Sequence, residues 1–224
     1  IRMFEEIPED RLYKTYVTEE FLEAHRELFQ KKNPELVSSQ IMKELSDTMT
    51  PQGVLALVKI REFHMEQLAR NDALLLVLEN LQDPGNLGTI LRSGEGAGVT
   101  GIIMSRDTVD IYNPKVIRST MGSIFRVPFV YADDMNEVIR FLKKNQITTY
   151  AAHLDGTNYT KEDYNKGTAF FIGNEGNGLS RELTRAADHM IRIPMNGKVE
   201  SLNAAMAAGL LMYEARRQRE KGGK

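Results

Sequence analysis

The first segment with residues suited to chemistry is Asp83–Arg92, which directly follows the strand-like run Leu74–Glu79. The pair Pro84-Gly85 suits the centre of a type II turn, and Asn86 is predicted to cap the helix that follows. Arg92 lies six residues beyond this cap, so its long side chain could reach back toward the strand ends. Taken alone, Arg92 is better explained as a surface residue.

A glycine-rich loop, Gly173–Ser180, follows a second apolar run and precedes a helix that Ser180 is predicted to cap. Such loops often bind phosphates through backbone N–H groups. Here Glu175 would place a carboxylate where the phosphate charge belongs, and no Lys-Ser or Lys-Thr pair follows. A cationic or neutral ligand fits better, and glycines that simply permit positive φ explain the loop equally well.

The third segment, Ile191–Asn203, reads as a strand, a long loop and the start of the last helix. Ser201 is a natural N-cap, whereas Asn203, placed inside the first turn, is a poor helix former without such a structural role. The small residues of Ala204–Gly209 would let another helix approach closely. They indicate either core packing or a subunit interface.

The elements that must position these segments read as an α/β fold, a parallel sheet flanked by helices. Ligands of such sheets bind outside the carboxyl ends of the strands, where all three segments lie. The predicted strands are Leu74–Leu78, Gly101–Met104, Val127–Tyr131, Thr148–His153, Ala169–Ile172 and His189–Ile193.

The amino-terminal part of the chain is predicted to form a separate small α/β unit. It contains the strand-like runs Lys14–Val17 and Val54–Ile60. The charged stretch Arg61–Asp72 is interpreted as a connector, with a helix as the alternative. We place the boundary near Ala69, which gives domains of residues 1–69 and 70–224.

Composition excludes several classes of protein. The chain has 224 residues, 42% hydrophobic and 27% charged, with no apolar run near the roughly 20 residues that span a bilayer. Because no signal sequence is visible, we expect a cytoplasmic protein. The absence of cysteine excludes disulfides, a thiolate nucleophile and cysteine-ligated metals.

Neither the histidines nor the net charge points to a particular ligand. The four histidines lack metal-ligand spacing, so we expect no structural metal. A net charge of −2 means that a nucleic acid would need a local basic patch or a second subunit.

Taken in order, the three segments resemble the three motifs of the SpoU/TrmH family of RNA ribose methyltransferases. The motifs are Asn86-x-Gly88-x-x-x-Arg92, then Gly173-Asn174-Glu175-Gly176-x-Gly178, then Ile193-Pro194-Met195 through Ser201-Leu202-Asn203. The resemblance spans roughly Leu74–Arg219. Residues 1–69 resemble the ribosomal-protein-like RNA-binding domain of many members, with its first strand absent here.

This resemblance implies a methyltransferase that acts on a ribose 2′-hydroxyl of rRNA or tRNA, with rRNA favoured. It also implies a carboxyl-terminal trefoil knot, a homodimer, and S-adenosylmethionine bound in the knot. The residues that match its cofactor positions are Gly173, Gly178, Ile193, Met195 and Leu202.

The resemblance further assigns five polar site residues: Arg92, Asn86, Glu175, Ser201 and Asn203. A guanidinium is effectively never deprotonated, so we expect Arg92 to grip a phosphate or stabilise developing negative charge, while a phosphate or water takes the proton. Glu175 would orient Arg92 or the loop, because acting as a base requires a raised pKa. Ser201 and Asn203 would hold ribose or backbone.

Lys115 and Arg118 are candidate phosphate contacts, and a solvated helix face explains them equally well. Two rival functions remain open. One is a non-catalytic RNA-binding or assembly protein that retains the fold. The other is a nucleotide-phosphate enzyme, which the lack of a phosphate-binding lysine motif disfavours.

Overall fold

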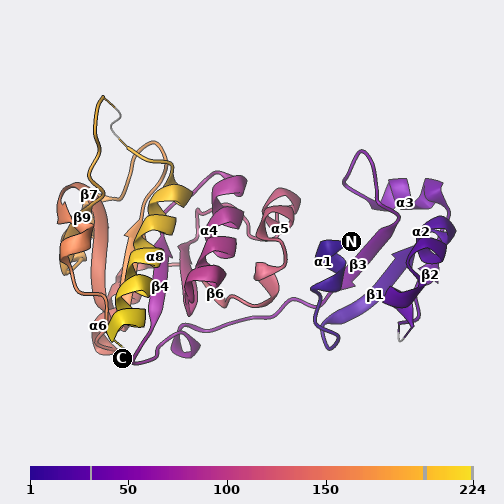
Figure 1. Cartoon of the computed structure of the whole chain (residues 1–224), viewed down its shortest axis with the longest axis horizontal. Helices are drawn as coiled ribbons and strands as arrows, with labels where there is room; N and C mark the ends of the chain where they lie inside the picture. Colours follow the sequence, from indigo (N-terminus) through magenta and orange to yellow (C-terminus); the bar gives the residue numbers. More distant parts are fainter. Residues whose placement is uncertain (31, 199–200, 223–224) are drawn as a thin grey trace. The chain divides into compact units, whose positions relative to one another are not determined.

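The computed structural model describes residues 1–30, 32–198 and 201–222, and it divides into two compact units, Ile1–Arg61 and Glu62–Lys224 (Figure 1). This division falls before the boundary near Ala69 that the sequence suggested. The reason is Leu68, which is fully buried in the core of the larger unit together with Leu75 and Phe171. The connector is therefore the first part of the larger unit and contains one short 3₁₀ turn, Met65–Gln67.

The small unit is built on a three-stranded mixed sheet in the order β2-β1-β3. Strand β1 (Leu12–Val17) pairs in parallel with β2 (Glu35–Leu36) and antiparallel with β3 (Val54–Val58). Its helices are α1 (Arg2–Glu5), α2 (Glu19–Ala24) and α3 (Ser39–Leu45), with a 3₁₀ turn at Arg26–Phe29. The core consists of Phe4, Ile7, Val17, Phe21, Phe29 and Met42.

The larger unit is built on a six-stranded sheet in the order β6-β5-β4-β8-β7-β9, with every pair parallel. All six runs expected to be strands lie in it, which confirms the parallel α/β prediction. The strands are β4 (Leu74–Leu78), β5 (Gly101–Ser105), β6 (Phe129–Ala132), β7 (Thr148–Asn158), β8 (Thr168–Ile172) and β9 (His189–Arg192). The central strands β4, β5 and β8 are buried at every position, as expected for strands covered on both faces.

Helices cover both faces of this sheet. They are α4 (Pro84–Ala97), α5 (Pro114–Thr120), α6 (Met135–Lys144), α7 (Arg181–Ala186) and α8 (Ala204–Gly222). On one face Val138 of α6 and Leu183 of α7 pack against Val77 and its neighbours. On the other, α4 lies between α5 and α8 (Figure 1). Short 3₁₀ turns occur at Ser123–Phe125 and Tyr159–Lys161.

Helix α8 runs over β4 and β8, from the carboxyl ends of the strands to their amino ends. Arg219 anchors the last turns of the helix. The Arg219 guanidinium donates to the carbonyl oxygens of Asp72, Ala73, Tyr164 and Lys166, at 2.7, 3.1, 2.8 and 2.6 Å. These carbonyls precede β4 and β8, so they lie at the amino edge of the sheet. Because Arg219 fixes one end of α8 at the amino ends of the strands, the first turn of the helix lies at their carboxyl ends, beside the start of α4.

Candidate active site

The loops that follow β4 and β8 lie side by side at the carboxyl edge, because these two strands are neighbours. The Asn174 amide donates to the carbonyl oxygen of Asn80 at 2.8 Å. The backbone N–H of Ser180 donates to the Glu79 carboxylate at 2.7 Å. The loops after β4 and β8, distant in sequence, are therefore held together at this edge.

The start of α4 differs from the sequence-based expectation. Pro84 is the first residue of the helix, and Asp83 caps it by accepting from the backbone N–H of Asn86 at 2.7 Å. Proline is well suited to the first helical position because the missing N–H would have no partner there. The expected type II turn at Pro84-Gly85 and the cap role of Asn86 are therefore wrong, and the Asn86 side chain is left to make other contacts.

The start of α8 also differs. The helix begins at Ala204, and Asn203 caps it by accepting from the backbone N–H groups of Ala205 and Met206, at 3.0 and 3.3 Å. Asn203 was expected within the first turn, and Ser201 at the cap. Asparagine is as good a cap as serine, and the actual helix start lies one residue beyond Asn203. The predicted cap at Ser180 is confirmed, since its hydroxyl accepts from the Leu183 N–H at 3.1 Å.

A chain of hydrogen bonds joins all three motif segments. Asn203 donates from Nδ2 to Oδ1 of Asn86 at 2.9 Å, and Asn86 donates from Nδ2 to Oε1 of Glu175 at 2.9 Å. Glu175 also accepts from the backbone N–H groups of Gln82 and Asp83, both at 3.2 Å. We call these five residues the motif network. Asn86, at its centre, is only 8% exposed.

The motif network keeps Glu175 ionised. Partial burial raises its pKa, but the hydrogen bonds from Asn86 and from the backbone N–H groups outweigh burial and leave the pKa below its usual value. A carboxylate with a lowered pKa is a weak base at neutral pH. The hydrogen bonds of the ionised Glu175 therefore connect the two loops to the start of α4.

Arg92 lies two turns into α4 and is exposed, and within the described residues its side chain makes no hydrogen bond or ion pair. It shares a helix face with Gly88, four residues earlier, where α4 meets α5 closely. A Cβ at Gly88 would collide with the Ser119 side chain. Helix α5 carries Lys115 and Arg118, whose side chains are likewise exposed and unpaired among the described residues. Two adjoining helices thus carry three cations available to a ligand.

The glycine loop after β8 is closed by its own backbone. Asn174 and Gly178 exchange two backbone hydrogen bonds, of 3.0 and 2.9 Å. A Cβ at Gly173 would collide with the backbone of Gly178 and Leu179, and Gly178 adopts a positive φ of 66°. The loop carries no Lys or Arg that would repel a cationic ligand.

The remaining expected cofactor residues lie on the segment between β9 and α8. Ile193, Met195 and Leu202 are each partly buried, and Ser201 is exposed. Leu202 directly precedes Asn203 of the motif network, and half-buried apolar side chains of this kind suit a ligand with a flat apolar ring. The structure thus joins Asn86, Glu175 and Asn203 directly, whereas no hydrogen bond among the described residues ties Arg92 or Ser201 to them.

Three residues of this edge were missed by sequence reasoning. Asp83 could have been found, because an Asp directly before a Pro is a helix-start signal. Gln82 joins the motif network only through its backbone N–H, which no side-chain pattern reveals. Asn80 takes a left-handed φ of 54°, and its N–H and Oδ1 both bond the Ser105 hydroxyl at 2.8 Å. These two bonds fix the loop that presents Gln82 and Asp83.

Across the part of the chain that the structure describes, no group of three or more His, Cys, Asp or Glu side chains could hold a metal ion. In the same residues, no helix has both the length and the apolar character needed to cross a bilayer.

Comparison with known sequences gives a consistent set of similar proteins. Residues 73–213 match the sequence profile of the SpoU rRNA Methylase family. The chain is 37% identical over 196 residues to an uncharacterised tRNA/rRNA methyltransferase of Synechocystis, covering 87% of this chain and 71% of the relative. It is 33% identical over 182 residues to RlmP of Bacillus subtilis, a 23S rRNA guanosine 2′-O-methyltransferase, covering 81% and 71%.

The similar solved structures are also methyltransferases. The fold is similar to that of the SpoU methyltransferase AviRb from Streptomyces viridochromogenes in complex with AdoMet, with a TM-score of 0.84 and 30% identity over 93% of this chain and 83% of that one. It is also similar to an AdoMet-bound rRNA methyltransferase from Sinorhizobium meliloti, with a TM-score of 0.81, 30% identity and coverage of 92% and 80%.

Proposed function

The chain belongs to the SpoU rRNA Methylase family, and we propose that it methylates a ribose 2′-hydroxyl of ribosomal RNA at the carboxyl edge of its six-stranded sheet. Its methyl donor is S-adenosylmethionine, as in the AdoMet complex of AviRb. The observation that carries the proposed location is the motif network, which unites Asn86, Glu175 and Asn203 from the three motif segments. The relatives named as 23S rRNA 2′-O-methyltransferases support rRNA as the substrate.

The donor site is formed in this proposal by the glycine loop and the segment after β9. Backbone groups of Gly173 and Gly178 would hold the adenosine, with Ile193, Met195 and Leu202 against its apolar surface. The partly buried apolar side chains and the loop without Lys or Arg fit such a ligand. When bound, S-adenosylmethionine supplies an electrophilic methyl group on a sulfonium.

The acceptor site lies, in this proposal, over α4 and α5. Arg92 would grip a substrate phosphate or stabilise negative charge as it develops on the 2′-oxygen, with Lys115 and Arg118 on further phosphates. The 2′-hydroxyl proton would pass to a phosphate oxygen or water, because neither Arg92 nor the ionised Glu175 is a suitable base. Ser201 and Asn203 would hold the ribose or the backbone around it. The main task of the site is therefore alignment, which can supply about 7–11 kcal/mol in favourable cases.

We further propose that the segment between Arg192 and Asn203 forms the trefoil knot of the family. Strand β9 is an edge strand beyond β7 and β8, while Asn203 contacts Asn86 next to β4. The two described ends of this connection therefore lie at the edge and near the middle of the sheet, as a return of the chain through such a knot would require. Residues 199 and 200 of this segment lie outside the described residues.

We also propose that the separate unit of residues 1–61 recognises the RNA substrate, as its resemblance to a ribosomal-protein-like domain suggests. We propose a cytoplasmic location, because bacterial relatives such as RlmP act on 23S rRNA. Incubation with labelled S-adenosylmethionine and either unmodified rRNA or unmodified tRNA tests the substrate. We expect label in rRNA; label in tRNA alone would refute the rRNA assignment, and tight cofactor binding without transfer to either would favour the non-catalytic alternative.

Helix α8 supports a homodimer in this proposal. Met206, Leu210 and Tyr213 are 58%, 37% and 49% exposed, and their spacing places them on one helix face. Exposed apolar side chains that form a stripe on one helix are typical of a subunit interface. A dimer would also bring a second set of cations to the RNA, which a chain of net charge −2 needs.

The double variant Met206→Glu/Leu210→Glu is expected to convert a dimer into a monomer, because two charges would be buried in the interface. Sedimentation at micromolar concentration measures the mass. The matched control is Leu154→Glu on β7, at a side chain that is 64% exposed and should leave the dimer intact. A monomeric wild type, or a double variant that stays dimeric, would remove α8 as the interface.

A further inference from the structure

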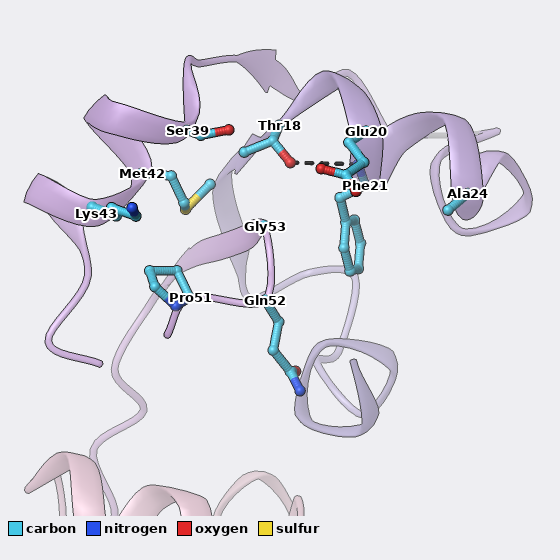
Figure 2. A pocket seen from close by; sticks show the side chains of 10 residues that line it. All are labelled: Thr18, Glu20, Phe21, Ala24, Ser39, Met42, Lys43, Pro51, Gln52 and Gly53. Carbon is cyan, nitrogen blue, oxygen red and sulfur yellow. Dashed lines mark hydrogen bonds between the residues drawn. The ribbon is translucent and has the colours of Figure 1, made fainter. Parts of the chain in front are cut away.

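A pocket in the small unit belongs to no part of the methyl-transfer site. It lies between α2, α3 and the loop before β3, with a volume of about 330 Å³ (Figure 2). Phe21, Met42 and Gly53 are buried and form its floor. Gly53 has a φ of 90°, and a Cβ there would lie 2.7 Å from the Thr18 hydroxyl and 2.9 Å from Cβ of Phe21. A side chain at this position would thus be strained and crowded against the floor.

Opposite charges line opposite sides of this pocket. Glu20 comes from α2 and Lys43 from α3, and the two helices face each other across it (Figure 2). Within the described residues, neither side chain makes a hydrogen bond or an ion pair, with the other or with any third group. Ser39 adds a hydroxyl to the α3 side. The walls therefore offer an unused acceptor on one side and unused donors on the other.

A flat heterocycle with donors on one edge and acceptors on another matches these walls. The volume lies at the small end of the range for ligand pockets, roughly 300–1,000 Å³, so it suits one base and not a helix or strand. Guanine presents its N1–H and N2 amino group to a carboxylate, and its O6 and N7 to an ammonium. Adenine would instead turn its N1 acceptor toward Glu20, so the carboxylate discriminates between the two purines.

The charge of the small unit favours binding through a base over binding through phosphates. Residues 1–61 contain nine Lys and Arg against eleven Asp and Glu, so the unit has no general attraction for the RNA backbone. Proteins read RNA sequence mainly from unstacked bases held against apolar side chains. We propose that this pocket binds an unstacked guanine of the substrate RNA, an inference that rests on the proposed function.

Fluorescence anisotropy of the full chain with labelled seven-nucleotide RNAs tests the pocket. The probes are single-stranded oligouridines with guanosine, adenosine or inosine at the centre. Guanosine should bind about tenfold more tightly than adenosine, with inosine, which lacks the N2 amino group, between them. Glu20→Gln and Lys43→Met should each lower the affinity for the guanosine probe about five- to tenfold. Glu20→Gln should also abolish the preference for guanosine over adenosine.

Glu19→Gln and Lys59→Met are the matched controls, because they remove the same charges from exposed side chains that do not line the pocket. Both should bind like the wild type. No binding, equal binding of the three probes, or a guanosine preference that survives Glu20→Gln would overturn the proposal.

Methyl transfer to rRNA, measured in parallel, separates this proposal from the proposed function. If the chain transfers methyl groups but does not prefer guanosine, guanine binding by the pocket is refuted and the proposed methyltransferase function stands. A Glu20-dependent preference in a chain that transfers no methyl group supports the pocket and refutes the proposed function.

Discussion

Replacing Arg92 with alanine is expected to slow methyl transfer by about 10²- to 10³-fold, the loss typical of removing one preorganised group that stabilises charge in a transition state. The side chain is exposed and unpaired among the described residues, so we expect its removal to leave the fold and the proposed donor site unchanged. Cofactor affinity and melting temperature should therefore match those of the wild type. Single-turnover transfer to rRNA, cofactor titration and thermal unfolding measure the three quantities.

Arg92→Lys and Arg140→Ala complete this experiment. Lysine keeps the charge but lacks the planar guanidinium that binds phosphate through two hydrogen bonds, so Arg92→Lys should recover only part of the rate. Arg140 lies on α6, a helix that covers the opposite face of the sheet, and Arg140→Ala should transfer methyl groups at the wild-type rate. Near-normal turnover by Arg92→Lys would contradict the bidentate role, and near-normal turnover by Arg92→Ala would exclude Arg92 from the chemistry.

Asn86→Asp is expected to reduce transfer by about 100-fold at neutral pH, although it changes one NH₂ group to oxygen. Asn86 donates to Glu175 across 2.9 Å, and the variant places two carboxylates at this distance, one at the buried position 86 and one on the exposed residue Glu175. Their repulsion would separate the start of α4 from the glycine loop. It would also raise the pKa of the pair, so that one bound proton restores the contact as the pH falls. The variant's rate relative to wild type should therefore rise toward acid pH.

The double variant Asn86→Asp/Glu175→Gln provides the control for the Asn86 prediction. The glutamine amide would donate to the new carboxylate at position 86, which would still accept from Asn203. The bond between positions 86 and 175 is thereby restored with its direction reversed, although the amide nitrogen no longer accepts from the Asp83 N–H. We expect the double variant to transfer faster than Asn86→Asp alone and to lose the acid-dependent gain. Equal rates for the single and double variants would show that the motif network does not position the site.

The sequence predicted the sheet well because buried parallel strands read as continuous apolar runs, of which Leu74–Leu78 is the plainest. It predicted the helix starts poorly because several residue types that can cap a helix stand close together. Asp83 and Asn86 compete at α4, and Ser201 and Asn203 at α8, and only the hydrogen bonds distinguish them.

The contacts that build the site could not be predicted from local patterns. Asn86 lies 89 residues from Glu175 and 117 from Asn203, so the motif network exists only once β4, β8 and α8 are placed together. The domain boundary was displaced for a similar reason, since the charged connector conceals Leu68, which packs into the core of the larger unit. The pocket of the small unit likewise combines side chains from two helices and a loop that no motif links.

The chemical identity of the product tests ribose methylation most directly. Unmodified rRNA is incubated with the wild-type chain and S-adenosylmethionine carrying a tritiated methyl group, then digested to nucleosides and separated. We predict that the label elutes with a 2′-O-methylated nucleoside. Label in a base-methylated nucleoside, or no transfer by a chain that binds the cofactor, would contradict ribose methylation as its function.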